Sequence, residues 1–164
     1  MILSTPRTLC RPLCEADFEA ILKMYAEPDS HKFVAPLKGK SIEEYRAFLT
    51  KKLENNESDV GFWSIFLVES NELIGTANLN RFQNTEMYHI GCHLKRSWWG
   101  QGYAYEVLTE LRDFGFNSQN LTEIYGIIEK EHTVSAQLMQ KMGFKLFEER
   151  TLDGSQLHFF RSSI

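Results

Sequence analysis

The segment CHLKRSWWGQGYAYE, residues 92–106, contains the most informative pattern of the sequence. It starts with residues typical of a strand, passes through Gly100 and Gly102, and continues with the apolar spacing of a helix. The first N–H groups of a helix lack partners within the helix and lie at the positive end of its dipole, so they bind anions that can approach them. Glycine leaves room for that approach. By themselves, the two glycines favour a phosphate site and a simple chain reversal about equally.

Two other phosphate-binding motifs fit this stretch less well. A Rossmann fingerprint would have a further glycine or an alanine three residues after Gly102, and Tyr105 stands there. A Walker loop would need Gly-Lys-Ser or Gly-Lys-Thr, which the stretch lacks. Backbone amides are therefore the expected donors to any phosphate bound at this turn.

Strand-like runs lie upstream of the glycines, at 62–68, 73–79 and 87–94. The residues between the first two, Glu-Ser-Asn-Glu at 69–72, predict a hairpin turn and thus an antiparallel meander. A shorter strand is expected at 8–13, near the start of the chain.

Helices are expected before and after this meander. Asp17 is expected to cap a first helix, and Ser41 begins a second with the capping-box pattern Ser-Ile-Glu-Glu. A third helix follows Gly102, and a last one ends at Gly143. Further strands are expected at 124–128, 144–148 and 157–161. This order predicts one domain, 1–164, of the α+β or mixed α/β class, with helices on both faces of its sheet.

The composition disfavours several classes of protein. Apolar residues make up 43% and charged residues 24%, and no apolar run approaches the roughly 20 residues of a membrane-spanning helix. The first residues lack the features of a secretory signal, so we expect a cytoplasmic protein with no membrane partner. A net charge of −4 without a Lys/Arg block disfavours nucleic acid as a partner. Three cysteines without a C-x-x-C pair predict reduced thiols and no metal site.

Four segments resemble, in order, the GNAT acetyltransferase superfamily, particularly its branch of ribosomal-protein N-terminal (alanine/serine) acetyltransferases. Residues 5–13 are similar to the first strand of that branch, and residues 73–77 to its central hairpin. Residues 99–106 are similar to its acetyl-CoA signature, and residues 135–144 to its late helix and following strand. The resemblance covers almost the whole chain.

This resemblance implies a strongly twisted, mixed sheet of about six or seven strands. Its fourth and fifth strands, 87–94 and 123–128, would splay apart to receive the pantetheine arm of acetyl-CoA, the expected cosubstrate. Backbone groups of Cys92, His93 and Leu94 would pair with pantetheine amides, as an edge strand does. The pyrophosphate would lie on the amides of Trp99, Gly100, Gln101, Gly102, Tyr103 and Ala104.

Three positions depart from the superfamily pattern. Ser97 stands where arginine or glutamine usually begins the signature, which softens the match but leaves the backbone donors in place. His132 stands where an asparagine commonly contacts the cofactor, and its ring could donate a hydrogen bond to the cofactor. Met139 replaces the tyrosine that many members use to protonate the departing thiolate. Ser135 becomes the candidate for that proton donor, with an ordinary helix-surface hydroxyl as the alternative interpretation.

Acetyl transfer also needs a neutral amine. A lysine-type amine has a pKa of about 10.4 and an α-amine about 8, so a base or a water chain must assist. His89 is the first candidate because its ordinary pKa of about 6.5 suits a base, and Glu86 is the second. A packed histidine and a solvated turn carboxylate are the structural alternatives. The N–H of Cys92 is expected to stabilise the oxyanion during direct attack by the amine.

The acceptor is left open among a protein N-terminus, a polyamine, an amino-sugar and a small metabolite. The family places the acceptor near the N-terminal helices and the loop 31–40, and Phe82, Trp98 and Trp99 are candidates to line its pocket. A second hypothesis is a catalytically idle acyl-CoA-binding or sensing domain, motivated by His132 and Met139. Strand ends and aromatic residues are also compatible with a homodimer.

Overall fold

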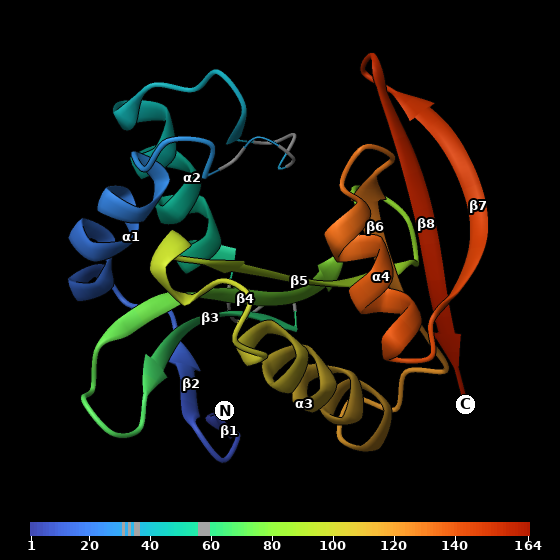
Figure 1. The fold of residues 1–164 in the computed structure, drawn as a ribbon, viewed down its shortest axis with the longest axis horizontal. Coiled ribbons are helices and arrows are strands. Elements are labelled where there is room, and N and C mark those ends of the chain that lie inside the picture. The colour runs from blue at the N-terminus through green and yellow to red at the C-terminus, as the bar shows by residue number, and fades with distance from the viewer. Residues whose placement is uncertain (31, 33, 35–36, 56–59) are drawn as a thin grey trace.

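The computed structural model describes residues 1–30, 32, 34, 37–55 and 60–164, whose eight strands form one sheet. The strand order is β1-β2-β3-β4-β5-β6-β8-β7 (Figure 1). All neighbouring strands are antiparallel except β5 and β6, which run parallel. The strands are β1 (Leu3–Ser4), β2 (Thr8–Pro12), β3 (Gly61–Leu67), β4 (Leu73–Arg81), β5 (Tyr88–Leu94), β6 (Glu123–Glu129), β7 (Lys145–Leu152) and β8 (Ser155–Ser163).

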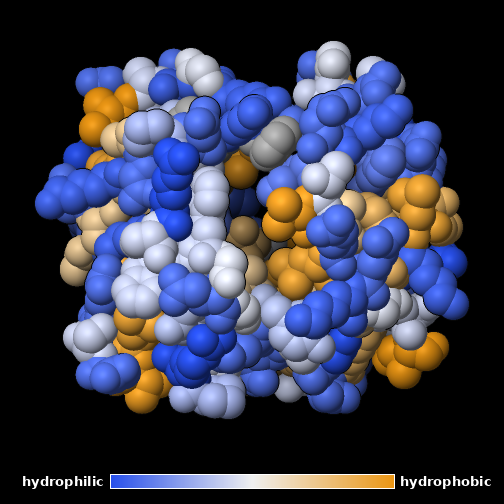
Figure 2. All heavy atoms as spheres, in the orientation of Figure 1, coloured by the Kyte–Doolittle hydropathy of each residue, from blue (hydrophilic) through white to orange (hydrophobic). Residues whose placement is uncertain are grey.

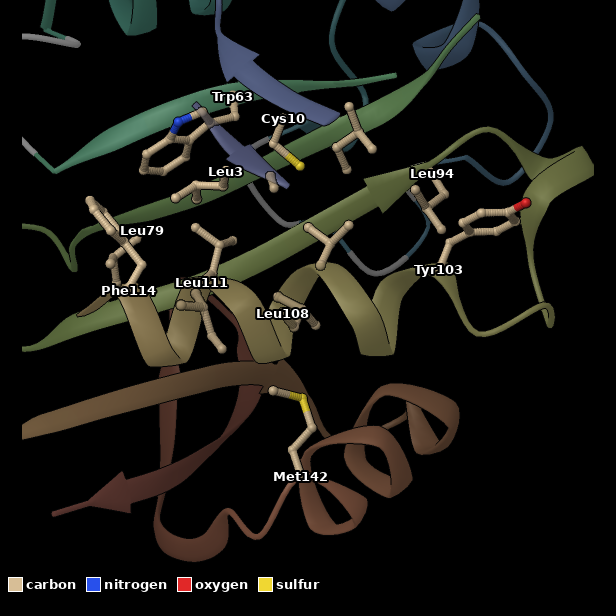
Figure 3. Packing of buried hydrophobic residues seen from close by; sticks show 14 of the residues in the cluster. Leu3, Cys10, Trp63, Leu79, Leu94, Tyr103, Leu108, Leu111, Phe114 and Met142 are labelled. Atoms are coloured by element: carbon tan, nitrogen blue, oxygen red, sulfur yellow. The ribbon is translucent and has the colours of Figure 1, made fainter. Parts of the chain in front are cut away.

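Helices cover both faces of this sheet, as predicted. They are α1 (Phe18–Tyr25), α2 (Ile42–Asn55), α3 (Tyr103–Asn117) and α4 (Thr133–Lys141). Side chains alternate along β3: Phe62 and Phe66 pack with α1 and α2, whereas Trp63 and Ile65 pack with α3. Figure 3 shows the α3 side of the sheet, with Tyr103 beside Leu94 at the start of α3.

The predicted hairpin between β3 and β4 is confirmed. The amide of Leu67 donates to the carbonyl of Glu72 at 2.9 Å and so closes the turn. Within the turn, Asn71 has a φ of 57°, a left-handed conformation that asparagine tolerates better than most residues. Gly143 likewise has a φ of 87° just after α4, as expected of a glycine that ends a helix.

Two details differ from the sequence-based predictions. The sheet has eight strands instead of six or seven, because a two-residue strand, β1, pairs with β2 and is too short to show a pattern. Asp17 makes no side-chain cap to α1. Its buried carboxylate accepts hydrogen bonds from Arg11 at 2.8 and 3.0 Å and from Ser64 at 2.7 Å instead. The Ser41 cap is confirmed, since its hydroxyl oxygen accepts from the amide of Glu44 at 3.2 Å.

Two further observations complete the description of the fold. Among the helices formed by the described residues, none is both long and apolar enough to cross a bilayer. Cys10, Cys14 and Cys92 are free cysteines in the structure.

Candidate active site

The strands β5 and β6 meet at one register pair and then part. His89 lies opposite Tyr125, and the two described strands share no other register pair. This divergence is the predicted splay. It was expected between the fourth and fifth strands, which are β5 and β6 here because the short strand β1 precedes the predicted ones (Figure 1). Figure 2 shows the surface hollowed between the α2 and α4 sides of the molecule, with hydrophobic residues in the hollow.

Alternation along β5 decides which of its backbone groups face the gap. At one end the carbonyl of Met87 accepts a hydrogen bond from Phe82 at 2.7 Å, and at the other the amide of Lys95 donates to Ile74 at 2.8 Å. Both bonds lie on the β4 side, and the register between them is regular. Successive residues of a strand turn their backbone groups to opposite edges. Odd-numbered residues therefore bond to β4, and even-numbered residues face the gap.

The gap edge beyond the register pair belongs to Cys92 and Leu94. The carbonyl of Leu94 accepts a hydrogen bond from the indole Nε1 of Trp99 at 2.8 Å. The amide of Leu94 and both backbone groups of Cys92 face a region without a paired strand in the described structure. Such an edge can pair with amides of an extended ligand. The Cys92 side chain instead packs toward α3, where burial raises the pKa of its thiol.

His93 requires a correction, because its backbone faces β4. Its register partner is Thr76, and as an odd-numbered residue it lies among those bonded to β4. The His93 ring stacks on Tyr25 with 5.2 Å between centroids, and its Nε2 lies 2.8 Å from the Ser30 hydroxyl oxygen. His93 therefore joins β5 to the end of α1, and its backbone does not line the cofactor edge.

A row of unpaired amides follows β5. A 3₁₀ turn at Arg96–Trp98 leads to Gly100 and Gly102, which have φ values of 71° and 86°. No acceptor in the described part of the chain takes a hydrogen bond from the amides of residues 100–105. The helical bonds begin with the Glu106 amide, which donates to the carbonyl of Gly102 at 3.1 Å. These amides also lie at the positive end of the dipole of α3, so they can bind an anion. We call residues 100–105 the anion cradle.

The two tryptophans beside the cradle have different environments. The amide of Trp99 donates to the carbonyl of Arg96 at 3.2 Å, so it is already paired, unlike the other predicted cradle amides. Its side chain is 47% exposed. Trp98 packs edge-on against Tyr103, with 5.7 Å between centroids, and joins the core. Of the two side chains, Trp99 is the more accessible to a ligand.

Arg7 is a residue of this region that the sequence analysis missed. From the turn between β1 and β2, its Nη2 donates to the carbonyl of Gln101 at 2.9 Å. The guanidinium group also forms an ion pair with Glu106 in the first turn of α3, at 2.7 Å. The two partners stand 94 and 99 positions further along the chain, so no local pattern could reveal the contacts.

The start of α4 brings the predicted residues His132 and Ser135 together. The hydroxyl oxygen of Ser135 lies 3.1 Å from Nε2 of His132. Burial lowers the pKa of His132 below its ordinary value, which keeps the ring neutral near pH 7. Met139 is 3% exposed, and a Cβ added to Gly126 of β6 would overlap its sulfur. Met139 therefore has a packing role, because its side chain packs between α4 and β6.

The predicted bases have contrasting environments. The His89 ring packs edge-on against Phe82, with 5.9 Å between centroids, and Phe82 packs in the same way against Phe159, at 5.5 Å. The Glu86 side chain is 86% exposed and pairs with Arg81 at 3.1 Å. His89 thus lies in an aromatic setting at the mouth of the gap, whereas Glu86 is a solvated carboxylate.

One ion pair connects the loop after α1 to the end of β6. Nζ of Lys38 donates to both carboxylate oxygens of Glu129, at 2.8 and 2.9 Å, and Glu129 is 8% exposed. The loop expected near the acceptor spans 31–40, and its residues 31, 33, 35 and 36 lie outside the described part of the chain. The Lys38 contact shows that the end of this loop reaches the β6 side of the gap.

Comparisons with known proteins agree with this geometry. Residues 7–145 match the family model of the acetyltransferase (GNAT) domain. The chain is 28% identical over 145 residues to an uncharacterised N-acetyltransferase, p20, of Bacillus licheniformis, which covers 87% of this chain and 82% of that protein. A crystal structure of an acetyltransferase from Agrobacterium tumefaciens superposes with a TM-score of 0.86 at 26% identity, over 100% of this chain and 95% of that one.

One solved structure of similar fold contains the cofactor. RimL, a ribosomal alpha-N-protein acetyltransferase in complex with coenzyme A, superposes with a TM-score of 0.84 at 17% identity, over 100% of this chain and 98% of that one. With a family model that spans most of the sequence, a diverging pair of strands and an anion cradle, the chain belongs to the GNAT family and is an acetyltransferase.

Proposed function

We propose that this protein transfers the acetyl group of acetyl-CoA to a primary amine by direct attack in a ternary complex. The observation that carries the proposal is the continuity of two open backbone surfaces. The gap-facing edge of β5 ends at Leu94, and the unpaired amides of residues 100–105 follow it along the chain. The first surface suits the amides of a pantetheine arm, and the second suits the pyrophosphate at its far end.

In this proposal three groups carry out the reaction. His89 takes the proton of the attacking amine, directly or through water. As the amine nitrogen bonds to the thioester carbon, the amide of Cys92 donates a hydrogen bond to the oxygen on which charge develops. The carbon–sulfur bond then breaks, and the hydroxyl of Ser135 gives its proton to the departing thiolate. Ser135 regains a proton from the solvent, to which His89 releases the proton it took from the amine.

Several features support direct attack without an acetylated enzyme. The thiol of Cys92 points to the core side of the sheet, and its raised pKa keeps it protonated. Cys10 is buried, and burial raises the pKa of its thiol to about 12. Neither thiol is suited to act as a nucleophile near neutral pH. The amine acceptor itself is the nucleophile in this proposal.

The acceptor belongs to one of four classes: a protein N-terminus, a polyamine, an amino-sugar or a small metabolite amine. The name of the RimL structure refers to an alpha-N-protein acetyltransferase, which puts peptides with free N-termini first in a substrate panel. The aromatic contacts of Phe82 and His89 offer apolar surface beside the amine. A panel should therefore include peptides with both small and large first residues.

The test measures thiol release from acetyl-CoA with purified protein and the amine panel. We expect stoichiometric release of CoA and an acetylated amine, identified by a mass increase of the acceptor. Without any amine, the intact mass of the protein should stay unchanged during incubation with acetyl-CoA. Binding of acetyl-CoA without thiol release from any amine would favour a catalytically idle acyl-CoA-binding domain, and an acetylated cysteine would contradict direct attack.

A further inference from the structure

We propose that Arg7 is a positioning residue that holds the anion cradle in its binding conformation, an inference that rests on the proposed function. The contacts of its guanidinium group surround the start of α3. Nη2 donates to the carbonyl of Gln101 at 2.9 Å, and Nε donates to Oε1 of Glu106 at 2.7 Å. The guanidinium carbon also lies 4.0 Å from the centroid of the Tyr103 ring, a cation–π distance. The Arg7 side chain thus contacts Gln101 before α3, Tyr103 at its start and Glu106 in its first turn.

The bond to Gln101 sets the direction of an amide in the cradle. In a trans peptide the carbonyl and the following N–H point in opposite directions. Arg7 holds the carbonyl of Gln101 on its own side, so the amide of Gly102 points away from Arg7. That amide is one of those without an acceptor in the described chain. By fixing the carbonyl, Arg7 aims the amide outward, where a diphosphate oxygen would accept its hydrogen bond.

The turn needs such a fixed point because its own backbone is permissive. Gly100 and Gly102 flank this region with φ values of 71° and 86°, and glycine crosses between backbone regions at low cost. Gly102 also begins α3 without any side-chain cap. A rotation of the peptide between residues 101 and 102 would turn a carbonyl oxygen toward the diphosphate and its amide away. The hydrogen bond from Arg7 opposes that rotation.

Arg7 also balances a charge that would repel the ligand. Glu106 places a carboxylate in the first turn of α3, close to the cradle amides. The guanidinium neutralises it, and the hydrogen bond with Glu106 raises the pKa of Arg7. Thr5 donates to Oε2 of Glu106 at 3.2 Å, and the amide of Thr8 donates to the hydroxyl of Thr5 at 3.0 Å. The buried residue Thr8 anchors this set of contacts to β2.

The experiment compares two ligands that differ in the diphosphate. Coenzyme A engages the cradle, whereas pantetheine lacks the phosphates and engages only the gap. Arg7→Ala should weaken binding of coenzyme A, measured by calorimetry, by about tenfold or more. Its affinity for pantetheine, followed by NMR titration, should stay within about twofold of wild type. Arg46→Ala is the matched control, since Arg46 forms an exposed ion pair with Glu19 at 2.8 Å and should leave both affinities unchanged.

A second variant separates geometry from charge. Arg7→Lys keeps the charge but cannot bond to Gln101 and Glu106 together in the planar arrangement of a guanidinium. We expect it to bind coenzyme A more weakly than wild type, with an unchanged melting temperature. Three results would each overturn the positioning role. Arg7→Ala could lose affinity for coenzyme A and for pantetheine equally, or it could keep its affinity for coenzyme A. Arg7→Lys could bind coenzyme A as tightly as wild type does. Failure of the wild-type protein to bind coenzyme A would instead refute the proposed function.

Discussion

The hydroxyl oxygen of Ser135 lies 3.1 Å from Nε2 of His132 at the start of α4. When Nε2 carries a proton, it donates to the Ser135 oxygen and leaves the hydroxyl hydrogen directed elsewhere. We predict that Ser135→Ala lowers kcat by about ten- to a hundredfold, because the departing thiolate loses its proton donor. The Kd of coenzyme A should change little. Steady-state kinetics and calorimetry check this, with Thr133→Ala in the same helical turn as the control. A kcat equal to that of wild type would remove Ser135 from the mechanism.

His132 should make stability depend on pH. Its pKa is lowered from 6.5 by burial, only partly offset by Glu129, so the unfolded chain binds the proton more readily than the folded protein does. Stability is therefore full above pH 6.5 and falls as the pH drops through 6.5 toward the lowered pKa. We predict that wild type loses more unfolding free energy between pH 8 and pH 5.5 than His132→Asn does, measured by urea denaturation. Parallel losses in the two proteins would show that this ring does not titrate with folding.

The two candidate bases should differ sharply in their effect on turnover. His89→Ala should reduce kcat by about 10²- to 10⁴-fold, the range for loss of a general base, while coenzyme A still binds. Glu86→Gln should stay within about twofold of wild type, because an exposed carboxylate paired with Arg81 is solvated. A reversed order of the two effects would assign the base to Glu86.

Asp17 should be important for stability and not for turnover. Its carboxylate is 4% exposed and accepts hydrogen bonds from Arg11, Ser64 and the amide of Cys14. Asp17→Ala leaves these donors unpaired and should lower the unfolding free energy by about 2–4 kcal/mol. Glu19→Ala, which removes the exposed partner of Arg46, should change it by less than about 1 kcal/mol. Urea denaturation of both variants checks the contrast, and similar losses would contradict it.

Local patterns predicted the elements because short-range physics forms them. Ser41 caps α2, the turn after β3 closes at Asn71, and Gly143 ends α4, each through contacts within a few residues. The same kind of reasoning was wrong for Asp17. Its position suggests a helix cap, but Arg11 and Ser64 offer its carboxylate charged and buried partners, and Ser64 stands 47 positions away.

The candidate site was predicted in outline for the same reason. The glycine turn before α3 and the residues His132 and Ser135 are each visible in a short segment of sequence. The backbone direction of His93 could not be predicted from such a segment, because it depends on the register between β4 and β5. Arg7 was missed because its partners, Gln101 and Glu106, lie 94 and 99 positions away in the sequence.

The local sequence is enough to predict that a strand passes through two glycines into a helix, since backbone sterics and side-chain spacing act between near neighbours. Which backbone groups stay unpaired depends on the folded chain as a whole. That choice depends on where β6 leaves β5 after His89 and Tyr125, and on the Arg7 hydrogen bond to the turn. Hydrogen-bond donors become a binding surface only when no other part of the folded chain takes them, and that condition involves residues far apart in sequence.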